Sequence, residues 1–257
     1  MARWIVMALL LTMGAASPAC ADGLADATAL PPGIKPLEKP LEGLRFRPVD
    51  QFAHAWGRWL MIGKRSNLVE AFEIHGTVKA QDDRLLWTYK LYNLGRDDKL
   101  QEWGEVEVLT DSWGKVEKAK ILSDLLPKVP LKPGSFAYLD ASNLDFPLCC
   151  LPHGPVSMGS RVDLARPDSE NRASPDAPRV ISDDRHSVVA GVQTKDGHRY
   201  LVLRHDGGMT LDIDGTRLSS VQTGYEQIDI DNGLPRFDIK SNANTLTTTL
   251  QVRKTQY

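Results

Sequence analysis

Large apolar side chains recur at every second position along much of this chain, beginning near residue 68. The segments Leu68–Val78 and Leu85–Leu91 each place such residues on one parity, and polar residues 81–84 separate them. Similar alternation marks a third segment at 106–108 and a fourth at 116–121. A period of two is that of a β-strand with one buried face, so the pattern predicts strands joined by polar turns.

The second half of the chain repeats this pattern with stronger turn signals. Strands are predicted over residues 188–193, 199–205, 209–213, 227–230, 234–239 and 245–252. Asp-Gly and Asn-Gly pairs lie between several of them and supply the positive φ angles that tight hairpins need. Consecutive hairpins with few helical segments predict a mainly β, antiparallel fold, either a sandwich or two curved half-barrel sheets.

One segment ahead of these strands has a different spacing. Within residues 49–62, Phe52, Trp56 and Trp59 are separated by four and three positions. That spacing predicts a short amphipathic helix near the N-terminus of the mature chain. The preceding residues 22–48 are rich in proline and predict an extended segment without a regular element.

The chain therefore divides into two β-rich halves, predicted over residues 49–125 and 180–257. A connecting segment over 126–179 joins them and contains a polar, proline-rich linker at 165–178. Glycine and aspartate recur at comparable places in both halves, which is consistent with a duplication. Two unrelated antiparallel meanders would also have glycine and aspartate at their turns, so duplication and independent origin both stay open.

A cleaved secretory signal peptide is predicted over residues 1–21. Arg3 gives a basic start, Ile5–Met13 an apolar run, and Ala19–Ala21 a cleavage site of small residues. The run is too short for a hydrocarbon core about 30 Å thick. A lipoprotein signal would retain Cys20, but only the alanine before it fits such a site. We expect an exported protein without a stable membrane anchor, in the periplasm or, as the alternative, outside the cell.

The net charge of the chain limits which classes of partner are expected. The chain has 31 Lys and Arg against 33 Asp and Glu, a net charge of −2 at pH 7. No basic face is dense enough to indicate nucleic acid. The expected partner is a ligand or protein of the cell envelope.

The strongest candidate for a metal-binding or redox cluster in the sequence is Cys149, Cys150 and His153. Two thiols and an imidazole can hold a soft metal ion such as copper, or the thiols can form a redox pair. The alternative is that both cysteines pack as small apolar side chains. Copper is the cofactor under the first interpretation, and no cofactor is predicted under the second.

Trp113 is the candidate ligand-binding residue. It lies in a predicted turn and is expected to be exposed, whereas the other tryptophans after the signal peptide are expected in the core. Ser112 and Lys115 of this turn match a Ser-x-x-Lys pattern. The Ser-Asp-Asn and Lys-Thr-Gly motifs of that chemistry are missing from the sequence, so this match is rejected.

The remaining candidate chemistry is weaker. No zinc-hydrolase spacing occurs among the 6 histidines. His198 and His205 begin and end a predicted strand and are expected to be turn or edge residues. Asp229–Gly233 has aspartates but not the ligand spacing of a calcium loop, and it predicts a hairpin turn. The sequence therefore names no catalytic residue.

Three functions of different classes follow from these observations. The first is a non-enzymatic envelope protein that binds a ligand or partner on its sheet surface or in a cavity, or has a structural role. The second is a periplasmic soft-metal or thiol-redox protein that uses Cys149, Cys150 and His153. The third is a hydrolase whose residues converge only in the fold, which a histidine–carboxylate pair in a cleft would indicate.

Overall fold

The computed structural model describes residues 28–62, 65–94, 100–123, 151–162, 179–213 and 215–257. The predicted signal peptide, Cys149, Cys150 and the linker at 165–178 lie outside these residues. No helix within the described parts of the chain is long and apolar enough to cross a membrane.

Thirteen strands make up the described structure. In the first half they are β1 (Val49–Ile62), β2 (Arg65–Gln81), β3 (Arg84–Leu94), β4 (Leu100–Thr110) and β5 (Val116–Ile121). The others are β6 (Arg161–Val162), β7 (Arg179–Asp183), β8 (His186–Lys195), β9 (His198–Asp206), β10 (Gly208–Ile213), β11 (Thr216–Asp229), β12 (Pro235–Ala243) and β13 (Thr248–Gln256).

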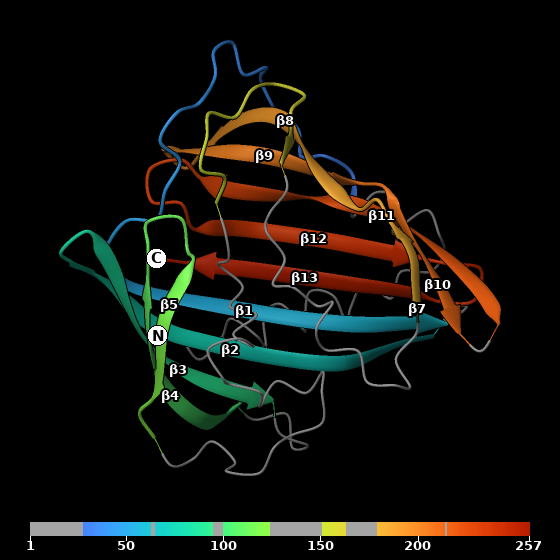
Figure 1. Ribbon diagram of the computed structural model, residues 1–257, viewed down its shortest axis with the longest axis horizontal. Helices are drawn as coiled ribbons and strands as arrows, with labels where there is room; N and C mark the ends of the chain where they lie inside the picture. The colour runs from blue at the N-terminus through green and yellow to red at the C-terminus, as the bar shows by residue number, and fades with distance from the viewer. Residues whose placement is uncertain (1–27, 63–64, 95–99, 124–150, 163–178, 214) are drawn as a thin grey trace.

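All of these strands belong to one open antiparallel sheet (Figure 1). The order across it is β5-β4-β3-β2-β1-β13-β12-β11-β9-β8-β6, and β10 and β7 extend it from β11. The predicted mainly β, antiparallel fold is confirmed. The predicted halves are not separate sheets or the two layers of a sandwich, because β13 pairs with β1 and joins them edge to edge.

The predicted helix over residues 49–62 is wrong, because this segment is strand β1. Phe52 and Trp56 are four residues apart, an even spacing that places both on one face of a strand as well as of a helix. Trp59 then lies on the opposite face, in a separate cluster from Phe52 and Trp56. Hydrogen-bonded neighbours on both sides, β2 and β13, decide between the two periods.

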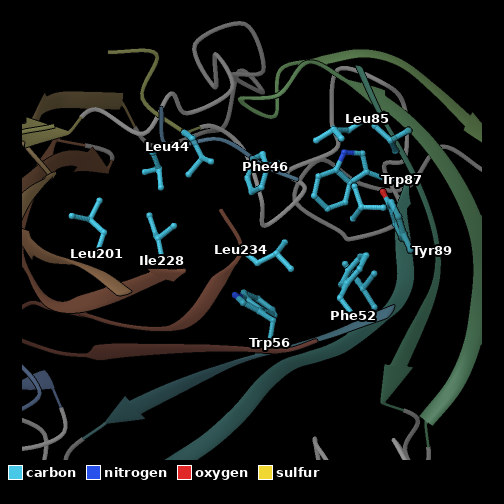
Figure 2. Packing of buried hydrophobic residues seen from close by; sticks show 14 of the residues in the cluster. Leu44, Phe46, Phe52, Trp56, Leu85, Trp87, Tyr89, Leu201, Ile228 and Leu234 are labelled. Atoms are coloured by element: carbon cyan, nitrogen blue, oxygen red, sulfur yellow. The ribbon is translucent and has the colours of Figure 1, made fainter. Parts of the chain in front are cut away.

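The sheet curves around its main hydrophobic core, and we call the face toward that core the inner face. Figure 2 shows strands on three sides of the cluster, with Leu44 and Phe46 closing over it. The indole of Trp87 meets the ring of Phe46 edge to face at 5.4 Å and that of Phe52 at 5.9 Å. Such aromatic pairs add stability beyond the area that they bury.

Leu44 and Phe46 come from the segment that was predicted to be extended. Residues 29–48 form no strand of their own, but single bridges join Lys35 to Val192 and Leu41 to Val156. These bridges hold the segment across the inner face. A proline-rich segment therefore contributes two buried side chains to the core.

Polarity is inverted in the central strands β12 and β13. Their apolar residues, including Ile239, Leu250 and Val252, lie on the outer face and cluster with Trp59. The alternation predicted for residues 245–252 is present for Leu250 and Val252, whereas Leu246 is 72% exposed in a turn. The inner face of the same strands carries charged side chains instead, and these define the candidate site.

Candidate functional site

Two rows of side chains cross the inner face at right angles to the strands. Strand register defines the first row, which consists of Phe72, Trp56, Arg253, Asp238, Glu226, Leu203 and Val189. Aromatic residues thus stand at one end, aliphatic residues at the other, and three ionisable groups between them. Because directly opposed side chains on one face of an antiparallel sheet are close neighbours, the row forms a continuous strip.

The second row lies two residues further along each strand. It consists of Arg58, Gln251, Lys240, Gly224, His205 and Ser187. Gly224 leaves a gap between His205 and Lys240. The imidazole of His205 extends across this gap to the carboxylate of Asp238, which belongs to the strand beyond β11.

The backbone also requires glycine at position 224. Its φ is +139°, in a region that other residues rarely adopt, and a Cβ there would lie 1.9 Å from the carbonyl oxygen of Ile239. A side chain would therefore disturb the pairing of β11 with β12. Glycine both permits the local backbone and opens the space for the His205–Asp238 contact.

Asp238 is the centre of the charged group. Its Oδ1 is 2.8 Å from Nε2 of His205, and its Oδ2 is 3.3 Å from Nζ of Lys240 and 3.4 Å from Nε of Arg253. The carboxylate is fully buried. Burial opposes its ionisation, but the charges of Lys240 and Arg253 and the hydrogen bond with His205 outweigh it and lower the pKa of Asp238.

His205 is a buried, neutral link between Asp238 and Ser187. Burial, together with the charge of Lys240, lowers the pKa of His205 to about 4. Since the carboxylate of Asp238 only accepts, Nε2 of the neutral ring carries the proton and donates to it. Nδ1 then accepts from the hydroxyl of Ser187 at 3.0 Å. The prediction that His205 is a turn or edge residue is wrong.

Glu226 lies opposite Asp238 and differs from it in its hydrogen bonding. Its side chain is buried, and Oε2 has no hydrogen-bond partner among the described residues. Burial, reinforced by the negative charge of Asp238, raises the pKa of Glu226 to about 7. The two neighbouring carboxyls therefore ionise in different pH ranges.

The aromatic end of the first row is tied to the charged centre. Trp56 and Phe72 pack with ring centroids 5.0 Å apart. In the orientation that satisfies its amide, Gln251 accepts hydrogen bonds from Nε1 of Trp56 and from Arg253. The guanidinium of Arg58 lies 6.0 Å from the Trp56 ring. Aromatic surface and cationic groups therefore adjoin on the inner face.

A neutral histidine extends this region toward the core. The Nδ1 of His54 is 2.9 Å from the hydroxyl of Thr255, and its Nε2 has no hydrogen-bond partner among the described residues. Burial and the charge of Arg253 lower its pKa to about 3. His54 therefore adds a polar atom but no charge at neutral pH.

This arrangement can bind polar groups, and one part of it resembles a nucleophile with its base. No group of three or more His, Cys, Asp or Glu suited to a metal ion is found in the described parts of the chain. Ser187, His205 and Asp238 form a hydrogen-bonded chain of the serine–histidine–carboxylate type. Ser187 is buried, however, so its hydroxyl does not face solvent.

The residues predicted as sites from the sequence lie elsewhere. Cys149 and Cys150 are outside the described residues, so the soft-metal site stays a prediction. His153 is exposed and stacks on Trp113 with centroids 4.5 Å apart. Trp113 is half-buried against the core, and the guanidinium of Arg45 lies 5.7 Å from its ring. The structure does not bring Trp113 and His153 into the two rows.

One signal in the sequence pointed to part of the missed site. His205 shares its parity with Leu201 and Leu203, and Glu226 shares its parity with Ile228, so both continue an apolar face of a strand. A polar residue at such a position indicates a buried polar group that needs a partner. No such signal marks Asp238, since its face of β12 reads as the solvent side.

The chain has little resemblance to known proteins. No family model matches it, and no curated protein does. Among solved structures it is similar to a LolA superfamily protein from Nitrosomonas europaea, with 10% sequence identity, a TM-score of 0.19, and 83% of this chain and 88% of that chain covered. A likeness of this size carries no functional argument.

Proposed function

We propose that this chain is an exported, non-enzymatic binding protein that holds a ligand against the inner face of its sheet. The binding region consists of the two rows, with their charged centre on β11, β12 and β13. Export rests on the signal peptide predicted over residues 1–21. The ligand is a molecule of the envelope.

The inverted polarity of the central strands carries this proposal. A buried ion pair often contributes less to stability than well-packed apolar residues of the same volume. Yet β12 and β13 place Asp238, Lys240 and Arg253 toward the inside of the curve and their apolar residues on the outside. An arrangement that stability does not favour is expected where a protein binds something.

The flanks of the first row define the character of the ligand. Trp56 and Phe72 on one side, and Leu203 and Val189 on the other, are buried apolar neighbours of the charges. Ligand sites in proteins combine apolar walls with a few placed polar groups. An amphipathic ligand therefore fits this strip better than a small ion or a purely polar molecule.

A fluorescence titration with the apolar dye N-phenyl-1-naphthylamine tests this proposal. We expect saturable binding, and a loss of affinity of about tenfold in Trp56→Leu, since a large aromatic contact contributes more than 1 kcal/mol. Trp113→Leu is the matched control and should bind normally. Circular dichroism must show both variants folded at the assay temperature.

The result can contradict the proposal in two ways. Absence of saturable binding to the folded wild-type protein would refute an apolar binding surface on this sheet. Loss of binding in Trp113→Leu with normal binding in Trp56→Leu would place the ligand at the turn of Trp113 instead of on the inner face. Native mass spectrometry of protein purified from its own host would then identify any retained ligand directly.

A hydrolase is the second candidate, and the Ser187–His205–Asp238 chain favours it. A neutral imidazole that accepts from a serine hydroxyl and donates to a carboxylate can act as a general base. A fluorophosphonate probe, which labels activated serines, separates the two candidates. The binding-protein proposal predicts no labelling of Ser187, whereas labelling that Ser187→Ala abolishes would establish the hydrolase.

A further inference from the structure

We infer that the two rows bind an acidic group, a carboxylate, sulfonate or phosphate, through Lys240 and Arg253. This inference rests on the proposed function and adds the chemistry of the ligand's polar end. The cations of the centre are more accessible than its carboxyls. The side chains of Lys240 and Arg253 are 19% and 24% exposed, whereas that of Asp238 is fully buried.

A ligand that approaches the inner face therefore meets ammonium and guanidinium groups first. Both cations contact the same atom, Oδ2 of Asp238, at 3.3 and 3.4 Å. These distances exceed those of strong charge-assisted hydrogen bonds, which are about 2.7–2.9 Å. Arg253 has a closer but neutral acceptor in the amide of Gln251, at 2.8–3.0 Å. Lys240 contacts no acceptor closer than 3.3 Å among the described residues, so the pair retains capacity for a second, charged acceptor.

Charge balance points to the same chemistry. In the charged centre on β11, β12 and β13, Asp238 compensates one of the cations Lys240 and Arg253, and the other carboxyl of this centre is Glu226. Arg58 of the second row lies outside this centre, opposite Glu70 of β2 in the strand register. Oε2 of Glu226 has no hydrogen-bond partner within the described residues. When Glu226 is protonated, one positive charge is left over and the carboxyl has a donor without an acceptor. An acidic ligand supplies both the missing charge and the missing acceptor.

The apolar residues beside the charged centre distinguish two possible sources of such an anion. A free inorganic ion needs only the charged centre, whereas the acidic group of an amphipathic molecule also uses the apolar flanks. Trp56 lies opposite Arg253 on the neighbouring strand, and Leu203 lies opposite Glu226. Both sources share the same recognition chemistry at Lys240 and Arg253, so the experiment includes an arm for each.

Two dyes that differ by one acidic group give the test. 1-Anilinonaphthalene-8-sulfonate carries a sulfonate on the same ring skeleton as the neutral N-phenyl-1-naphthylamine. We expect wild-type protein to bind the sulfonate about tenfold more tightly, as for hydrogen bonds to a charged group. Arg253→Gln and Lys240→Gln should each remove most of this preference, measured as the ratio of the affinities of the two dyes for the same variant.

Lys254→Gln is the matched control, because Lys254 follows Arg253 on β13 and points to the opposite face. It should keep the preference for the sulfonate. Glu226→Gln removes a competing negative charge and should bind the sulfonate at least as tightly as wild type. Affinity for the neutral dye shows whether each variant retains the binding surface, so a misfolded variant is recognised directly.

The outcomes distinguish this inference from the proposed function. Equal affinity for both dyes, or a preference that survives Arg253→Gln and Lys240→Gln, would overturn the acidic-group site and leave the binding surface in place. Failure of both dyes to bind would instead refute the proposed function. Where the preference is confirmed, displacement of the sulfonate dye by millimolar inorganic sulfate would identify a free anion, and no displacement would identify an amphipathic acid.

Discussion

Replacing Asp238 by asparagine tests whether the charged centre is held together as described. Asparagine has nearly the same shape, so its Oδ1 still accepts from His205. It has no charge, however, and Lys240 and Arg253 lose the carboxylate oxygen that both contact. The change therefore isolates the electrostatic role of Asp238 from its packing.

The size of the effect follows from the burial of the three groups. Removing one partner of a buried ion pair costs about 3–5 kcal/mol, because the other charge is left without compensation. Lys240 and Arg253 are partly exposed, and Glu226 on the opposite side can ionise in compensation. We therefore expect the lower end, a loss of about 3 kcal/mol in the free energy of unfolding.

Urea unfolding at pH 7 measures this loss. With an m-value of about 2–3 kcal/mol/M for a domain of this size, the midpoint should fall by about 1–1.5 M. The control is Asp231→Asn, since Asp231 is 65% exposed and its contact with Arg199 is 3.9 Å. That exposed pair should change stability by less than about 0.5 kcal/mol.

A loss in Asp238→Asn no larger than in the Asp231→Asn control would refute the reasoning. Such a result would mean that Lys240 and Arg253 are hydrated well enough to need no counter-ion. The inner face would then be less buried than described, and the charge balance that leads to an acidic ligand would fail with it.

Three further predictions concern neighbouring positions. Because burial raises the pKa of Glu226 from 4.5 to about 7, ionisation of this group destabilises the folded state as pH rises through that window. Glu226→Gln should therefore gain stability over wild type between these pH values, by about 3 kcal/mol in total, and show no gain below pH 4.5; a pH-independent difference in urea midpoint would contradict this. Gly224→Ala should lower the free energy of unfolding by more than about 2 kcal/mol, through backbone strain and loss of strand pairing. Gly215→Ala is the control: a Cβ there has nothing within 4 Å, so this variant should lose less stability when both are compared in thermal melts. Leu234→Ala should cost about 2–5 kcal/mol at a fully buried core position, and Leu246→Ala, in an exposed turn, should be neutral by calorimetry.

The strands could be predicted from the sequence because alternation and turn residues are local signals. The segment 49–62 shows where this fails, since an even spacing of aromatic residues satisfies both a helix and a strand. Only the partners of β1 on both sides resolve it. Leu68 shows a second limit. It shares its parity with Phe72, but a register shift between Arg58 and Trp59 interrupts the pairing of β1 with β2, and Leu68 is 36% exposed.

The candidate site could not be predicted, because it depends on register between strands far apart in sequence. Asp238 and Arg253 become neighbours through the pairing of β12 with β13, and Trp56 joins them through β1. His205 reaches Asp238 only because Gly224 leaves a gap on the strand between them. A single glycine is not a recognisable sequence motif, and no residue spacing along the chain predicts the contact that it allows.

The pairing of β1 with β13 also has a consequence for how the chain folds. His54 and Thr255, which share a hydrogen bond in the middle of the sheet, are 201 residues apart. The hairpins of each half can form early, since their strands are close in sequence. The two outer parts of the sheet nevertheless stay unconnected until the residues of β13 have been synthesised and inserted between β1 and β12. Until then β1 and β12 each present an unpaired edge, which is the kind of surface that invites aggregation. Folding is therefore expected to finish only when β13 is free to pair with both edges, with the insertion of this closing strand as its slowest step.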